Sequence, residues 1–102
     1  MSKLLFQNPE FHTGLNVSVR RGTKWNIENQ KGVTLADLQG NEYGSVNIET
    51  RVLRFCDLTN SDLACEHDPV CRTVAGLLSV MEQIYPTFDE REMVTLVYFR
   101  NE

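Results

Sequence analysis

The chain has 102 residues, of which 41% are hydrophobic and 24% are charged, and this composition is that of a globular protein rather than a disordered one. At this length we expect one domain, residues 1–102, large enough to bury a core without disulfides. No apolar run approaches the roughly 20 residues of a membrane-spanning helix, and the N-terminus lacks the features of a signal peptide. We therefore predict a cytoplasmic protein with no membrane partner.

The net charge of −4 is unevenly distributed along the chain. Residues 1–51 contain six lysines and arginines against five acidic residues, whereas residues 52–102 contain four against nine. Non-specific binding to duplex nucleic acid requires many cations against phosphates. This composition therefore excludes a protein that coats DNA or RNA, and any contact with nucleic acid must be local.

The first clear element is a strand at residues 15–20, where apolar and polar side chains alternate with the period of a half-buried strand. The polar side chains that share one face of this strand are Asn16, Ser18 and Arg20. Residues 33–37 and 44–55 are predicted to form a hairpin across the turn-forming residues 39–42. The apolar phase changes at Val52-Leu53, which predicts a bulge or bend there, and residues 56–67 are predicted to be a loop.

A helix is predicted at about residues 69–85. Asp68 is suited to cap it and Pro69 to occupy its first position, apolar residues then recur on one helical face, and Pro86 ends it. Gly76 is about 1 kcal/mol less favourable than alanine in the middle of a helix, so we expect it to lie against a close neighbour.

The last predicted strand, residues 93–99, is apolar on both faces, as in a central strand covered on both sides. The sequence thus indicates an α+β domain with one main helix, in which four or five strands form a small β-barrel or a strongly curved mixed sheet.

The segment GLNVSVR, from Gly14 to Arg20, resembles the short signature G-x-K-x-x-T-x-R of the ASCH domain family, a branch of the PUA-like β-barrels. Arg20 matches the signature arginine, and Ser18 keeps the hydroxyl group of the threonine. Gly14 matches the glycine when one residue is deleted, whereas Leu15 stands in place of the lysine. The resemblance extends more loosely to about residue 99, through an acidic loop, a helix ending in Ile-Tyr-Pro and a hydrophobic last strand.

This resemblance implies that the chain binds RNA or a modified nucleoside or nucleotide in a cleft of a PUA-like barrel. One bacterial branch of the family is similar to an amidohydrolase that deacetylates acetylated cytidine with the signature lysine and threonine and a loop glutamate. Carried over to this chain, Ser18 fills the hydroxyl role and Glu66 or Asp68 the carboxylate role. No residue fills the role of the lysine unless Lys24 reaches back.

A binding surface also follows from the residues themselves. Alternate residues of the first strand present an amide, a hydroxyl and a guanidinium group on one side, and arginine can read a base edge or a phosphate. Trp25 offers a face on which a base can stack, and Arg21 and Lys24 supply positive charge at the mouth. The predicted nucleoside- or RNA-binding residues are Asn16, Ser18, Arg20, Arg21, Lys24 and Trp25.

Structural alternatives exist for each of these residues. Trp25 can be a packing residue, Arg21 and Lys24 solvated surface charges, and Arg20 a partner of a carboxylate in the acidic half. Asp68 can serve as a helix cap and Glu66 as a solvated loop residue. His67, between these two carboxylates, is suggestive of acid–base chemistry.

Two other functions remain open at this stage. The first is a small amidohydrolase or ribonuclease that uses Ser18, Glu66 and Asp68. The second is a protein-interaction accessory domain, for example from a phage, that uses the acidic half as its contact surface.

The three cysteines form, with His67, the pattern C-x8-C-x-H-x3-C. Zinc can bind a set of three cysteines and one histidine, but the paired C-x2-C spacing is missing. We expect free thiols, no metal and no cofactor.

Overall fold

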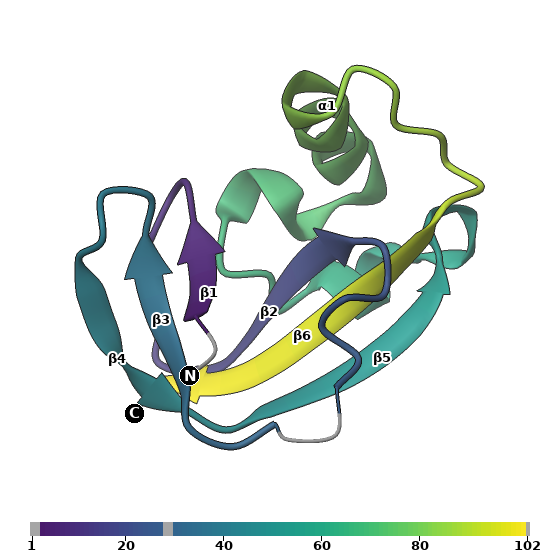
Figure 1. The fold of residues 1–102 in the computed structure, drawn as a ribbon. Helices are drawn as coiled ribbons and strands as arrows, with labels where there is room; N and C mark the ends of the chain where they lie inside the picture. Colours follow the sequence, from purple (N-terminus) through teal and green to yellow (C-terminus); the bar gives the residue numbers. More distant parts are fainter. Residues whose placement is uncertain (1–2, 28–29, 102) are drawn as a thin grey trace.

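The computed structural model describes residues 3–27 and 30–101, and over these ranges the chain has six strands and one α-helix. The predicted α+β class is confirmed (Figure 1). The strands form two separate three-stranded sheets, and within the described residues these do not join into a closed barrel. The strands, in chain order, are β1 (Lys3–Phe6), β2 (Gly14–Arg21), β3 (Val33–Asp37), β4 (Glu42–Val46), β5 (Ile48–Arg54) and β6 (Met93–Asn101).

The first sheet has the order β1-β3-β4, in which β1 runs parallel to β3 and β4 antiparallel to it. The second has the order β2-β6-β5, with both outer strands antiparallel to β6. The apolar last strand is therefore central in its sheet, as its sequence predicts, and is buried from Val94 to Val97.

The strand predicted over residues 44–55 is in fact two strands in different sheets. The break falls at Asn47, whose side-chain Oδ1 accepts a hydrogen bond from the backbone N–H of Gly32 at 3.2 Å. At the next residue, the N–H of Ile48 donates to the carbonyl of Gln30 at 2.8 Å. These bonds to the preceding loop replace pairing with β3 and turn the chain from one sheet into the other.

The bulge predicted at Val52-Leu53 is wrong, because β5 pairs with β6 in one continuous register from Ile48 to Arg54. The apolar phase changes there because both residues are half-buried, one on each face of the sheet. The one register shift in these ladders lies between β3 and β4, at Leu35/Ala36.

The helical part of the chain covers one face of the second sheet, whereas the first sheet packs against the opposite face (Figure 1). Successive residues of β6 alternate between the two resulting core clusters. Val94 and Leu96 pack with Phe55 and the helix, and Val97 and Phe99 pack with the first sheet. This alternation explains why the strand is apolar on both faces.

The helix predicted at 69–85 consists of a 3-10 turn, Pro69–Arg72, followed by α1, Val74–Ile84. Thr73 interrupts them, since its backbone is extended and its side chain caps α1 by accepting the N–H of Gly76 at 3.1 Å. The predicted close neighbour of Gly76 is confirmed: a Cβ atom there would lie 2.0 Å from the carbonyl oxygen of Val70. The extended Thr73 folds the 3-10 turn back onto the first turn of α1.

In the part of the chain that the structure describes, no helix combines the length and the apolar character needed to cross a membrane.

Candidate functional site

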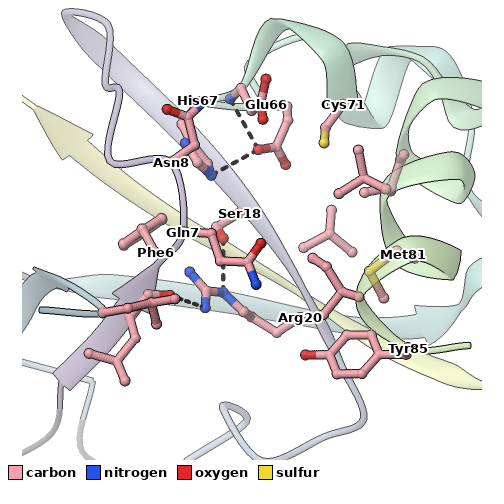
Figure 2. Close-up of a pocket in the computed structure, with 17 residues that line it drawn as sticks. Phe6, Gln7, Asn8, Ser18, Arg20, Glu66, His67, Cys71, Met81 and Tyr85 are labelled. Atoms are coloured by element: carbon pink, nitrogen blue, oxygen red, sulfur yellow. Dashed lines mark hydrogen bonds and ion pairs between the residues drawn. The ribbon is translucent and has the colours of Figure 1, made fainter.

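A pocket of about 310 Å³ lies where the first sheet, β2 and α1 come closest. Figure 2 shows Ser18 and Arg20 entering it from β2, Glu66 and His67 from the loop above, and Met81 and Tyr85 from the side of α1. Two of the predicted site residues, Ser18 and Arg20, thus meet both predicted carboxylates, Glu66 and Asp68, around one cavity.

Arg20 is held in this pocket by neutral groups. Its Nε–H donates to Ser18 Oγ at 2.9 Å, and its Nη1 donates to the carbonyl oxygen of Leu5 on β1. The guanidinium carbon lies 4.5 Å from the centroid of the Phe6 ring, in the geometry of a cation–π contact. The side chain thereby bridges the facing edges of the two sheets.

The charge of Arg20 has no ion-pair partner among the described carboxylates. Burial lowers its pKa to about 10, and nearby Glu66 opposes this shift, so the group remains a cation at neutral pH. A guanidinium has five N–H donors, and the bonds to Ser18 and Leu5 use two of them. The remaining donors are free to bind an acceptor in the cavity.

Glu66 reaches the pocket because its loop is pinned to β2. The N–H of Val17 donates to the carbonyl of Cys65 at 2.9 Å, and the N–H of His67 donates to the carbonyl of Val17 at 3.0 Å. Glu66 is 98% buried as a residue, so the alternative of a solvated loop residue is wrong. Burial raises its pKa to about 8, against the backbone N–H of Asp68 and the charge of Arg20.

His67 also lines the pocket, although the site predicted from the sequence did not include it. Its Nε2 lies 3.2 Å from Glu66 Oε1, and its Nδ1 lies 3.0 Å from the carbonyl oxygen of Glu10. The ring packs edge-on against Phe6, with centroids 4.8 Å apart, and burial lowers the His67 pKa. The only sequence signal was its position between two carboxylates, Glu66 and Asp68.

Asp68 combines a cap with a place at the pocket wall. Its Oδ1 accepts the N–H of Val70 at 3.0 Å, which confirms the alternative of a cap, although for the 3-10 turn rather than for α1. Its own N–H donates to Glu66 Oε1 at 3.2 Å. Asp68 therefore lines the polar end of the pocket, while its carboxylate is already used to cap the 3-10 turn.

Ser18 is buried and its hydroxyl accepts the Arg20 Nε–H. No described histidine or carboxylate forms a hydrogen bond with it. A serine nucleophile needs a neighbouring base to take its proton. The described contacts thus equip Ser18 to orient Arg20 rather than to attack a substrate.

Four of the predicted binding residues lie elsewhere. Asn16 is fully buried and holds the preceding loop, with Nδ2 donating to the carbonyl oxygens of His12 and Gly14 at 2.8 and 3.1 Å. Trp25 packs against the core between the two sheets, which agrees with the alternative that it is a packing residue. Neither residue lines the pocket.

Neither of the two remaining cations lines the cavity. Arg21 forms a bidentate ion pair with Glu92, with distances of 2.7 Å for Nε–Oε1 and 3.0 Å for Nη2–Oε2. Lys24 is exposed and does not line the pocket. The positive charge predicted at the mouth therefore does not gather there, because Arg21 lies on the opposite face of β2 from Arg20 and Lys24 lies exposed in the turn after the strand.

An apolar wall completes the pocket opposite its polar end. It comes from the face of α1 that looks toward β2, and its members are Leu77, Val80, Met81 and Ile84. At the mouth, Leu5 and Leu38 are 44% and 57% exposed. The cavity is thus polar inside and apolar along one side, which is the usual character of small-molecule sites.

A wider hollow of about 1050 Å³ lies between β4 and the C-terminal part of β6. It is not lined by Glu66, His67 or Arg20. The three cysteines are free, and the described residues contain no group of three or more His, Cys, Asp or Glu side chains placed to hold a metal ion.

Comparisons with family models, with curated proteins and with solved structures gave no match to this chain. The functional argument is therefore carried by the residues of the pocket.

Proposed function

We propose that the chain binds a single nucleobase, as a nucleoside, a nucleotide or an unpaired base of RNA, in the pocket between β1, β2 and α1. The observation that carries this proposal is the half-buried, cationic Arg20, which has no ion pair with a described carboxylate and keeps unused donors in the cavity. Beside it, Glu66 and His67 supply further polar atoms. A base edge presents donors and acceptors side by side, which such a group of side chains can read.

The size and charge of the site favour one base over a polynucleotide. A pocket of about 310 Å³ is at the small end of ligand sites. Arg20 is the only Lys or Arg among its lining residues, so a phosphate backbone would meet little positive charge, and binding to a long strand relies on such charge. The apolar wall of α1 suits the flat face of a base.

The proposal includes the fold family suggested by the sequence. Two three-stranded sheets whose edges β1 and β2 are bridged by Arg20 can be regarded as a PUA-like barrel that is open at this seam. In this reading, an ASCH-like domain would bind its ligand in the opening.

The test is a titration of the ¹⁵N-labelled protein with nucleosides, mononucleotides and a short single-stranded RNA, followed by amide NMR. We expect shifts at Ser18, Arg20 and the 66–68 loop. Arg20→Ala should weaken binding about 10- to 100-fold, since a hydrogen bond to a charged group contributes about 1.5–3 kcal/mol.

Arg100→Ala is the matched control, because Arg100 is exposed on β6 and lines the wider hollow instead. Loss of shifts in Arg100→Ala but not in Arg20→Ala would move the ligand to the other cavity. The absence of shifts with every nucleoside, nucleotide and RNA would reject the proposal.

A second candidate function is hydrolysis, and the position of Glu66 favours it. A buried carboxyl group with a pKa near 8 beside a histidine is suited to act as a general acid or base. Incubation with acetylated cytidine and with single-stranded RNA, followed by product analysis, tests this directly. No turnover above a Ser18→Ala, Glu66→Ala double variant would remove the hydrolase.

A further inference from the structure

The hydrogen bonds of His67 fix where its protons are. Its Nδ1 lies 3.0 Å from the carbonyl oxygen of Glu10. A carbonyl oxygen can only accept, so this contact requires an N–H at Nδ1. A neutral imidazole has one N–H, and its Nε2 must then carry a lone pair.

That lone pair points at Glu66, whose Oε1 lies 3.2 Å from Nε2. An ionised carboxylate only accepts hydrogen bonds, so a carboxylate facing a neutral His67 would place two acceptors together. One proton between the two atoms resolves the conflict. It resides either on Glu66, as a carboxylic acid that donates to Nε2, or on His67, as an imidazolium that donates to the carboxylate.

We propose that Glu66 and His67 hold one shared proton. The net charge of Glu66, His67 and Arg20 together is then +1, and it comes from Arg20. The ligand-binding half of this inference rests on the proposed function. The pocket then takes a neutral or anionic planar group and rejects a cationic one of the same shape. His67 acts as a positioning residue, since its Nε2, at the wall of the pocket, orients the Glu66 proton.

Burial supports the shared proton. The side chains of Glu66 and His67 are only 3% and 10% exposed, and burial disfavours any charged form. It raises the Glu66 pKa to about 8 and lowers the His67 pKa. The form with a carboxylic acid and a neutral imidazole is therefore the favoured one near neutral pH.

Several other charged and titratable groups act on the pair of Glu66 and His67. Arg20 on β2 favours the carboxylate, whereas Asp68 disfavours it. The Arg72 Nε–H donates to the backbone carbonyl of Glu66 at 3.0 Å. The remaining groups that interact electrostatically with this cluster are His12, Cys71 and Tyr85.

The first experiment uses the ligand-free protein. Imidazole ¹⁵N and carboxyl ¹³C NMR spectra are recorded as the pH is raised from about 6 to about 9.5, a range that brackets a carboxyl pKa well above its usual value. We expect a proton on Nδ1 of His67 throughout, and a Glu66 carboxyl signal that titrates near pH 8. A His67 protonated on Nε2 alone, or an ionised Glu66 beside a neutral His67 at pH 6, would overturn the inference.

The second experiment compares three flat probes of nearly equal shape: benzoate, benzamide and benzamidine. At about pH 6.5 we expect benzamidine to bind at least about tenfold more weakly than benzoate, since a like charge at short range costs about one pKa unit or more. Above the Glu66 titration this preference should shrink. In Glu66→Gln, which cannot ionise, the preference should no longer depend on pH.

These outcomes separate the inference from the proposed function. If benzoate and benzamide bind while every nucleoside fails, the proposed function is rejected and the inference stands. If benzamidine binds as well as benzoate at pH 6.5, or if none of the three binds, the ligand-class half is rejected. The spectra of the free protein decide the shared proton in every case.

Discussion

Arg20 and Arg21 are neighbours in sequence, yet their guanidinium groups lie on opposite faces of β2. Arg20 faces the pocket and the Phe6 ring. Arg21 lies 5.0 Å from the centroid of the Tyr85 ring and is paired with Glu92 on the other face. One cation is thus available to a ligand, and the other ties the end of β2 to Glu92, the residue before β6.

The pair between Arg21 and Glu92 gives the first prediction. Arg21→Ala should lower the thermal midpoint, because it removes two hydrogen bonds and the contact with Tyr85. The difference from wild type should shrink in about 1 M salt, since both side chains are about one-third exposed and salt screens such pairs. Ligand-induced shifts in the pocket should persist. A variant with wild-type stability but no binding would contradict this assignment.

Trp25 gives the second prediction. This prediction opposes the hypothesis, drawn from the sequence, that a base stacks on Trp25. The side chain is half-buried against the core between the sheets, so Trp25→Ala should destabilise the protein by roughly 1–2 kcal/mol through lost apolar burial. Urea denaturation measures this change. Nucleoside affinity, measured by NMR well below the denaturation midpoint, should equal that of wild type, whereas a tryptophan that stacks on a base would lose affinity on truncation.

Short-range sequence patterns predicted the parts of the site that depend on one element. Alternation along β2 places Ser18 and Arg20 on one face, and the resemblance to a family signature pointed to these residues with Glu66. The close approach at Gly76 also followed from a local observation, because glycine within a predicted helix is less favourable than alanine.

The parts that could not be predicted depend on contacts distant in sequence. Arg21 meets Glu92 across 71 positions and His67 meets Glu10 across 57, and no local pattern encodes either contact. The division of residues 44–55 into β4 and β5 was hidden for a similar reason. Both halves have strand-like patterns, and pairing with different partners, β3 and β6, separates them.

Gly76 gives the third prediction. Gly76→Ala would place a methyl group 2.0 Å from the backbone carbonyl oxygen of Val70, so the 3-10 turn must shift. We expect a loss of about 1–3 kcal/mol, as for other overpacked sites, despite the gain of about 1 kcal/mol in helix propensity. Ser79→Ala, at an exposed position of the same helix, should stay within about 0.5 kcal/mol of wild type. A Gly76→Ala variant more stable than wild type would show that the 3-10 turn can shift at little cost in free energy.

Glu66 gives the last prediction, which concerns stability and pH. Its pKa is about 8 in the folded protein against an ordinary value of 4.5. Between these values the folded state binds more protons than the unfolded state, so the contribution of Glu66 to stability decreases as pH rises through this window. One pKa unit corresponds to about 1.4 kcal/mol, so the effect is on the order of a few kcal/mol.

Other carboxylates act in the opposite direction, because their pKa values are lowered by folding. These groups are Asp37, Asp62, Asp89 and Glu92. The measurement is therefore the difference between wild type and Glu66→Gln in urea denaturation at about pH 5, 7 and 9. The glutamine variant should gain stability relative to wild type as pH rises, because its amide never has to ionise inside the pocket. A difference that stays constant over this range would mean that Glu66 is already ionised in the folded protein at pH 5 and that its carboxylate is compensated by Arg20.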